Sequence, residues 1–486
     1  MNKDFYKKNF YLIGATFLIF SPWILLFITI FLSGGSIYHS HPIWSDELYY
    51  WHEVLSLSEK GLDFGYYTLN EKTPRLLSFG LHGFGTISAY VPFAKLFGWN
   101  YNSIAIANNV YLSIALLIMV LLVKPTLKKI LFFTIFCISY MPLILYSSTS
   151  MSELLNYALL IIYFSLLYTF IKAESHRKKL FILLLVLCTY ISFIRVIYGI
   201  LFLPILLEYY KIVSFNSKFF KLSGITIVII ILLFYISSLF ISPYPFSFLG
   251  SLLASESVIK FITALGAHTA ESFINYMSPF YGKIEEVSFR YFMLLVMAII
   301  FWKTELIQTK FRKWNSPYFI SFIVLLFFFV INVTIYDIFS GCFRVTAPLF
   351  FCVILSLTLF NNTLITRLAI TVNLITILFS YALTDNRRKY ILIKERYTPI
   401  TINKTVNSII FNEDASSPYD NSIIISEYFD TNSILSLPAG IGFNTVFDDI
   451  TDNCKSNYIF SKKELNLNTY KVIKKSDEGF LYQKIK

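Results

Sequence analysis

Charged side chains are scarce in this sequence. Asp, Glu, Lys and Arg make up 14% of its 486 residues, whereas 56% are hydrophobic and the mean hydropathy is +0.63. An ordinary soluble domain carries about 25% charged residues, so this composition excludes a soluble globular protein. Apolar runs long enough to cross a bilayer recur along most of the chain and indicate a polytopic membrane protein.

The apolar regions also lack the short alternating segments of membrane β-barrels. Because unpaired backbone polar groups in lipid cost several kcal/mol each, long continuous apolar runs must form helices. The sequence therefore predicts an α-helical protein with about 11 transmembrane helices. They are expected at residues 10–32, 103–123, 130–147, 153–171, 180–193, 194–209, 222–241, 289–302, 317–335, 345–360 and 368–383.

The sequence contains five cysteines, and no two have CxxC spacing. Three of them lie inside apolar runs, so we expect neither a zinc site nor a disulfide framework. The first apolar run is long enough to span a membrane and is not followed by a convincing small-x-small cleavage site. We therefore expect it to be a retained first helix rather than a cleaved signal peptide.

Acidic residues are fewer than basic ones, 29 against 41, which gives a net charge of +12. The basic residues concentrate in alternate segments between the predicted helices, such as KPTLKK and KAESHRKK, as the positive-inside rule requires of cytoplasmic loops. The excess of basic residues is therefore explained by the membrane topology, and it argues against a nucleic-acid partner. We expect a multi-pass plasma (inner) membrane protein with a cytoplasmic N-terminus and an extracytoplasmic C-terminus.

Two domains are expected. Residues 1–383 form the transmembrane domain, with surface helices in the first outer segment, residues 33–102, where DELYYWHEVLSLSEK and PRLLSFGLHGFGTISAYVPFAKLFGW have mixed polarity at helical spacing. A second outer segment, residues 242–288, is also long enough to fold. A small extracytoplasmic α/β domain is expected at residues 384–486, because runs such as SIIISEYF and SNYIF are strand-like and SDEG favours a hairpin turn.

Acidic residues beside the apolar runs are the first candidate functional groups. Asp46 and Glu47 follow the first run, in HPIWSDELYYWHE, and Glu153 lies in the short outer turn of LYSSTSMSELLNY. Carboxylates at the membrane boundary can act as a base or hold a cation. Ordinary loop acids, and a stabilised helix N-terminus at Glu153, are the alternatives.

Two arginines accompany these acids. Arg344 lies in the tight outer turn of YDIFSGCFRVTAP, and Arg195 lies in the middle of CTYISFIRVIYGILFLP. An arginine deep in lipid costs from about 2.5 kcal/mol upward, so Arg195 is expected to face a wet cavity or an anion. Arg344 could instead anchor a helix entrance by pairing with Asp337 or a lipid headgroup.

The order and sidedness of these motifs resemble the GT-C superfamily of integral-membrane glycosyltransferases, which take sugars from polyprenyl-phosphate donors. In that family an acidic pair and aromatic residues follow the first helix. The matching residues here are Asp46, Glu47, Tyr49 and Tyr50. KTPRLLSFGLHGFGTISAYVPFAKLFGW is similar to the family's proline-led surface helix, SSTSMSELLNYALLIIYFSLL to its fourth helix, and FRVTAPLF to its late arginine-containing turn.

The resemblance covers roughly residues 1–383 and is to the polyprenyl-phosphate-sugar-dependent group of dolichyl-phosphate-mannose-protein mannosyltransferases and lipid A aminoarabinose transferases. There is no sequence-wide match to either of these. A WWD-type oligosaccharyltransferase signature is also missing, which argues against transfer of a whole glycan to asparagine. The acceptor stays open: a glycan, a lipid or a protein.

The resemblance implies inverting transfer of a sugar from a polyprenyl-phosphate-linked donor to an extracytoplasmic acceptor, in the synthesis of cell-envelope glycoconjugates. It makes Asp46 the catalytic base, with Glu47 and Glu153 positioning the acceptor. A divalent cation is the one cofactor left open, and Asp46 and Glu153 would hold it. Arg344 and Arg195 would bind the donor phosphate.

Other side chains of the first outer segment are secondary candidates. Lys72 and Arg75 could also meet the donor phosphate, and Tyr49, Tyr50 and His82 could contact the sugar or the acceptor. Solvated loop residues and an aromatic belt at the membrane interface are the alternative explanations. The expected partners are thus the lipid-linked donor, the acceptor and membrane lipids.

Two other classes of function remain open. A lipid-linked sugar flippase or transporter would explain the many helices and buried arginines, but the sequence has no interrupted helices in corresponding halves. A polysaccharide polymerase or ligase of another fold would not need an acidic pair after the first helix. The glycosyltransferase hypothesis requires Asp46, Glu153 and Arg344 to lie around one outer cavity.

The charge distribution predicts that the C-terminus lies outside the cytoplasm. A reporter enzyme that works only in the cytoplasm should therefore be inactive when fused after Lys486. The same reporter fused after Lys129, in a predicted cytoplasmic loop, should be active and serves as the control. Activity of the C-terminal fusion would mean that the helix count is wrong by an odd number.

Overall fold

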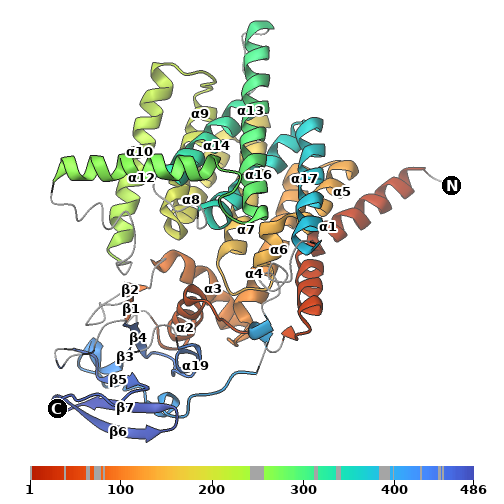
Figure 1. Ribbon diagram of the computed structural model, residues 1–486. Coiled ribbons are helices and arrows are strands. Elements are labelled where there is room, and N and C mark those ends of the chain that lie inside the picture. The colour runs from red at the N-terminus through yellow and green to blue at the C-terminus, as the bar shows by residue number, and fades with distance from the viewer. Residues whose placement is uncertain are drawn as a thin grey trace.

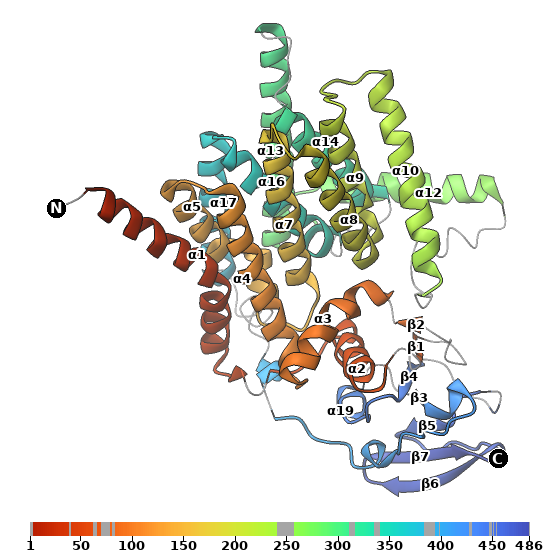
Figure 2. The same cartoon turned by 180° about the vertical axis from the view of Figure 1, so that it is seen from behind.

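The computed structural model describes residues 3–37, 40–61, 66–69, 78–79, 83–240, 257–310, 316–334, 341–382, 394–397, 399–426, 430–446, 450, 452 and 454–485. Most of them are helical, and a small sheet lies at the end of the molecule that holds the C-terminus. Figure 1 and the reverse view in Figure 2 show the long apolar helices grouped on one side of this sheet.

The apolar part of the chain is built of helices, as the sequence predicts. They are α1 (Lys3–Ser33), α4 (Ser103–Val123), α5 (Leu127–Ser139), α6 (Met141–Tyr146), α7 (Glu153–Lys172), α8 (Arg177–Ile194), α9 (Phe202–Tyr209), α10 (Ser217–Ser238), α12 (Val258–Met277), α13 (Ile284–Lys310), α14 (Ser316–Thr334), α16 (Ala347–Leu359) and α17 (Thr363–Ala382).

Each predicted span contains helix, so the expected helical class is confirmed. Among the described residues, five helices are long and apolar enough to cross a membrane by length and composition. They are Lys8–Ser33 and the helices α4, α7, α10 and α14. The number of about 11 spans remains a prediction.

Two predicted spans are interrupted. The span at 130–147 divides into α5 and α6 at Tyr140, where the backbone is extended. Pro142 lies in the first turn of α6, where its missing backbone N–H leaves no hydrogen bond unmade. The span at 194–209 is also divided, because Arg195 is extended (φ −145°, ψ 110°) and is followed by a 3₁₀ helix, Val196–Leu201, and by α9. Arg195 therefore lies at a helix break, not in the middle of a helix.

The first outer segment contains the two expected surface helices, α2 (Ser45–Lys60) and α3 (Gly83–Phe97). Helix α3 packs against the end of α8 at Gly85, where an added Cβ would lie 2.3 Å from the carbonyl oxygen of Phe193. Only glycine permits this approach. The second outer segment contains α12, which the sequence analysis did not anticipate and which runs across the direction of α10 in Figure 1.

A seven-stranded sheet joins the tail to the first outer segment. Its strands are β1 (Tyr66–Leu69), β2 (Ser78–Phe79), β3 (Ser422–Ile425), β4 (Gly442–Thr445), β5 (Tyr458–Ser461), β6 (Tyr470–Ser476) and β7 (Gly479–Lys484), in the order β2-β1-β4-β3-β5-β7-β6. The predicted SDEG hairpin is confirmed by antiparallel β6 and β7. Strand β1 pairs in parallel with β4, so the sheet uses residues from both sides of the domain boundary predicted at residue 383.

Helix α2 lies between the apolar helices and the sheet, as Figure 1 shows. Leu48 and Val54 belong to an apolar cluster that also contains Ile423 and Phe443 of the sheet. On the same helix, Ser56 accepts a hydrogen bond from the backbone N–H of Gly440 in the tail. The tail therefore holds α2 in place, and α2 carries the acidic pair.

The His52 ring strengthens this contact. Its Nε2 lies 3.3 Å from the carbonyl oxygen of Leu437 and its Nδ1 lies 3.1 Å from the Tyr67 hydroxyl. Burial lowers the pKa of His52 to about 4. The ring is therefore neutral at physiological pH, and it joins α2 to the tail by hydrogen bonds rather than by charge.

Candidate active site

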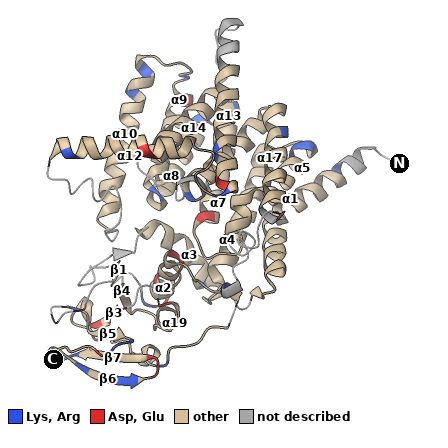
Figure 3. Ribbon diagram, viewed as in Figure 1, with Lys and Arg blue, Asp and Glu red and all other residues tan. Residues whose placement is uncertain are grey.

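Four of the predicted site residues come together from four separate elements. Asp46 lies in the first turn of α2, which Figure 3 shows as a helix with acidic residues, and Glu153 is the first residue of α7. Arg195 lies at the break after α8, and Arg344 lies in a one-turn π-helix, Gly341–Thr346, just before α16. Helix termini thus deliver all four side chains to one place.

Arg344 bridges the two carboxylates. Its Nη2 donates a hydrogen bond to Asp46 Oδ2 at 2.5 Å, and its Nε donates to Glu153 Oε1 at 2.8 Å. The Glu153 side chain is fully buried, whereas a quarter of the Arg344 side chain is exposed. Arg344 is therefore partly accessible, while Glu153 is enclosed.

Arg195 completes the cluster by donating from Nη2 to the same Glu153 oxygen, at 2.9 Å. Two arginines and two carboxylates balance in charge, which makes their burial tolerable. The cluster is therefore neutral as a whole, and Arg195 faces the Glu153 carboxylate rather than lipid.

Tyr50 lies beside this cluster, with its hydroxyl 3.4 Å from the Ser152 hydroxyl oxygen. Burial, and then the charge of Asp46, raise the pKa of Tyr50 well above its ordinary value. Its hydroxyl therefore stays protonated. The predicted contact of Tyr50 with a sugar or an acceptor remains a prediction.

Glu47 points away from this cluster. Its Oε1 accepts from the backbone N–H of Ser150 at 2.8 Å, and its Oε2 accepts from those of Ile43 and Trp44 at 2.8 and 3.0 Å. Arg396 donates to both oxygens, at 2.9 and 3.0 Å. These are the contacts of a structural carboxylate, and the predicted role of Glu47 in positioning an acceptor remains untested.

Tyr49 is enclosed by the sheet. Its hydroxyl donates to the carbonyl oxygen of Thr68 at 2.7 Å and lies 3.1 Å from the Thr445 hydroxyl oxygen, while its ring packs on Phe443. A sugar could reach this ring only if the sheet moved away from α2. The sugar contact predicted for Tyr49 therefore has no support from this geometry and remains a prediction.

Three other candidates, Lys72, Arg75 and His82, lie outside the described residues. Conversely, sequence reasoning missed several buried ionisable side chains, and two of them lie on or against α2. One is Arg396, which follows the last apolar run at a distance and carries no motif. The other is Glu53 on α2, whose pKa is raised well above its ordinary value by burial.

No group of three or more His, Cys, Asp and Glu side chains that could hold a metal ion is found within the described ranges. Between Asp46 and Glu153, the two residues predicted to hold a divalent cation, the positive charge is the Arg344 guanidinium. A metal shared by both acids would have to displace it. The divalent cation remains an open prediction.

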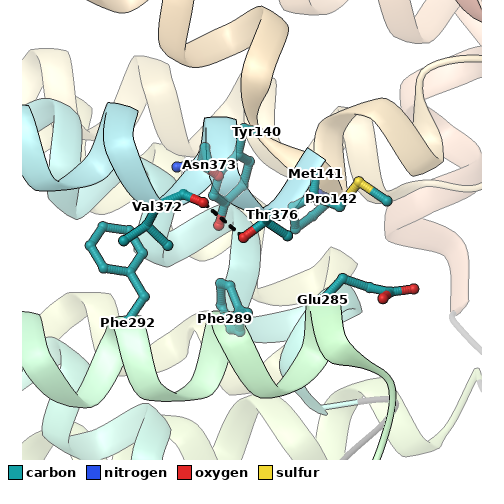
Figure 4. A pocket seen from close by; sticks show the side chains of 9 residues that line it. All are labelled: Tyr140, Met141, Pro142, Glu285, Phe289, Phe292, Val372, Asn373 and Thr376. Atoms are coloured by element: carbon teal, nitrogen blue, oxygen red, sulfur yellow. Dashed lines mark hydrogen bonds between the residues drawn. The ribbon is translucent and has the colours of Figure 1, made fainter. Parts of the chain in front are cut away.

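A small pocket lies elsewhere, between α5–α6, α13 and α17 (Figure 4). Its lining residues are Tyr140, Met141, Pro142, Glu285, Phe289, Phe292, Val372, Asn373 and Thr376. The close-up shows the rings of Phe289 and Phe292 below the α17 side chains. The lining is mostly apolar and includes none of the four clustered residues, so we assign the chemistry to the charged cluster.

Glu153→Gln should destabilise the protein strongly, because glutamine keeps the shape but leaves the buried Arg195 and the partly exposed Arg344 without their shared negative charge. Removing one partner of a buried ion pair typically costs about 3–5 kcal/mol. Chemical unfolding of the purified protein in detergent measures this. Glu413→Gln, which breaks the surface pair with Lys60, is the control and should change the stability little. If the two variants lost equal amounts of unfolding free energy, the stability of the cluster would not depend on the charge of Glu153.

No protein-family model and no curated protein matches the chain. Two solved structures of the Archaeoglobus fulgidus oligosaccharyltransferase are similar, one tethered with an acceptor peptide containing the NVT sequon via a disulfide bond and one in complex with Zn and sulfate. The TM-scores are 0.45 and 0.42, with 10% sequence identity in each comparison. The matches cover 91% and 90% of this chain but 64% and 62% of those chains, less than two thirds of their length.

Proposed function

We propose that this protein is a membrane glycosyltransferase that moves a sugar from a polyprenyl-phosphate-linked donor to an extracytoplasmic acceptor. The observation that carries the proposal is the Arg344 guanidinium, which is partly exposed and bound to the carboxylates of Asp46 and Glu153. The proposed base and the proposed phosphate ligand are thus in direct contact, and Glu153 stands at the first residue of the apolar helix α7. A lipid-phosphate sugar presents its reacting bond at that level of a membrane.

Arginine suits the leaving group. Its planar guanidinium offers parallel N–H donors that match phosphate oxygens in pairs. Negative charge grows on the departing phosphate as the bond from its bridging oxygen to the anomeric carbon breaks, and a fixed positive group lowers the energy of that state. Glu153 binds both Arg344 and Arg195, so it can hold the two phosphate ligands together.

Asp46 is the proposed base. The acceptor hydroxyl attacks the anomeric carbon, its proton passes to Asp46, and the lipid phosphate leaves with the bonding electrons from the opposite side. The configuration at the anomeric carbon is therefore inverted. Tyr50, with a hydroxyl that stays protonated, can donate a hydrogen bond near the reacting groups.

Donor binding and base activation are coupled in this arrangement. Arg344 donates to Asp46, and a carboxylate held by a guanidinium is a weak proton acceptor. A donor phosphate that binds Arg344 competes with Asp46 for the same donors. The base is then released only when the donor is present, which limits unproductive reaction with water.

The proposed activity predicts loss of one sugar from the surface glycans or glycolipids of cells that lack the protein. Reintroducing the parent gene should restore that sugar, and Asp46→Asn should not, since removing a general base alone reduces rates by roughly 10²- to 10⁴-fold. Mass spectrometry of the extracted glycans measures this. The matched control is Asp452→Asn, at an exposed carboxylate of the tail, which should restore the sugar.

An unchanged glycan profile in the deleted cells would contradict the glycosyltransferase proposal. Full restoration by Asp46→Asn at normal abundance would remove Asp46 from the reaction. Accumulation of the same lipid-linked sugar on the cytoplasmic side would instead indicate a flippase, and shortening of a polymer without loss of a sugar type would indicate a polymerase or ligase.

If Asp46 and the donor phosphate compete for Arg344, substitutions of Arg344 and of Asp46 should have opposite effects on the affinity for polyprenyl phosphate. Arg344→Lys should weaken binding at least about tenfold, equivalent to 1.4 kcal/mol, because lysine keeps the charge without the paired donors. Asp46→Asn should strengthen binding, by about threefold or more, because it removes the competing carboxylate. Binding to the purified protein is measured with polyprenyl phosphate and with the uncharged polyprenol.

Arg177→Lys is the matched control for Arg344→Lys, because Arg177 has the same exposure and also pairs with a buried glutamate, Glu208. It should leave the affinity for polyprenyl phosphate within about twofold of the parent. Weaker binding of polyprenyl phosphate by the Asp46→Asn variant would contradict the competition between Asp46 and the phosphate for Arg344. If the parent protein bound polyprenol as tightly as polyprenyl phosphate, a phosphate site would be excluded.

A further inference from the structure

Glu47 holds together two segments that are far apart in the sequence. Its Oε2 accepts hydrogen bonds from the backbone N–H groups of Ile43 and Trp44, immediately before α2. Its Oε1 accepts from the backbone N–H of Ser150, three residues before Glu153. One carboxylate therefore ties the start of α2 to the turn that leads into α7.

Arg396 adds a third segment to this junction. Its Nη1 donates to both oxygens of Glu47 and to the carbonyl oxygen of His41. The Arg396 carbonyl in turn accepts from the backbone N–H of His41 at 3.1 Å, and its guanidinium lies 5.1 Å from the centre of the Trp44 ring. Arg396 belongs to the segment that leads into the C-terminal sheet, so the tail is fastened at this point.

The pair is shielded from water. The side chain of Glu47 is fully buried and that of Arg396 is 2% exposed, so the interaction is not weakened by solvent in the way that surface pairs are. Its geometry is therefore expected to be constant. The two site carboxylates are attached to the segments that it joins.

The arrangement separates two roles within the acidic pair. Successive residues of a helix point about 100° apart, so Asp46 faces Arg344 while Glu47 faces Arg396. Glu47 follows Asp46 by one residue, and its other partner, Ser150, precedes Glu153 by three. The position of Asp46 relative to Glu153 thus depends on contacts made by Glu47.

We propose that Arg396 and Glu47 are positioning residues for transfer, which set the distance between Asp46 and Glu153 without contacting the donor. The proposal rests on the glycosyltransferase function proposed above and assigns the start of the tail a role in it. Neither residue touches Arg344 or Arg195 in a described hydrogen bond, so the phosphate site should be formed without the pair.

The test uses four variants of the full chain: Glu47→Gln, Arg396→Met, Arg396→Lys and the double variant Glu47→Gln/Arg396→Met. For each, three quantities are measured: the unfolding temperature, the affinity for polyprenyl phosphate, and the amount of sugar restored per molecule of protein in deleted cells. Lys60→Met, which removes a surface pair between α2 and the tail, is the control and should restore the sugar fully.

Each single charge-removing variant should lower the unfolding temperature, since it leaves one buried charge uncompensated. The double variant removes both charges and should regain most of that loss. Its transfer should nevertheless stay at least tenfold below the parent, with the affinity for polyprenyl phosphate within about threefold. Arg396→Lys keeps the charge and should restore part of the transfer.

A double variant that regains both stability and transfer would contradict the positioning role, because the pair would then serve folding alone. A parallel loss of lipid-phosphate affinity and transfer would also contradict it, since the pair would then shape the phosphate site. If the parent protein itself neither restores a sugar nor binds polyprenyl phosphate, the proposed function fails instead. The two failures are therefore distinguishable.

Discussion

The site depends on a single guanidinium that is shared between two carboxylates. Without Arg344, Asp46 and Glu153 would be like charges close together, and without Glu153 the two arginines would repel each other. Burial strengthens both interactions, because charges in a poorly solvated place act on one another more strongly than in water. The arrangement is stable only as a whole, and it leaves Arg344 accessible to a ligand that carries negative charge of its own.

The rest of the fold serves to bring four helix ends to this point. Helix α2 is held between the apolar helices and the sheet: Leu48 and Val54 belong to the same apolar cluster as Phe443, and His52 is hydrogen-bonded to the carbonyl oxygen of Leu437. Its first turn therefore has little freedom. The break after α8 and the π-helix before α16 place Arg195 and Arg344 outside regular α-helix, where a side chain can be aimed independently of helical spacing.

Much of this could be predicted from the sequence, for a physical reason: apolar runs in lipid must be helical, and a charge beside them must be paired. Those rules identified α4 and α7 almost to the residue and singled out Asp46, Glu153, Arg195 and Arg344. They could not identify Arg396, because an arginine in a polar tail is ordinary. Nor could they predict the pairing of β1 with β4, which joins residues about 380 positions apart, or the separate directions of Asp46 and Glu47.

The most direct measurement is a structure of the protein bound to polyprenyl phosphate in a lipid nanodisc. The proposed phosphate site predicts that the phosphate lies within hydrogen-bonding distance of the Arg344 guanidinium, that the hydrogen bond from Arg344 to Asp46 is broken, and that the bond from Arg344 to Glu153 is kept. A phosphate bound elsewhere, with the Arg344–Asp46 pair intact, would contradict it.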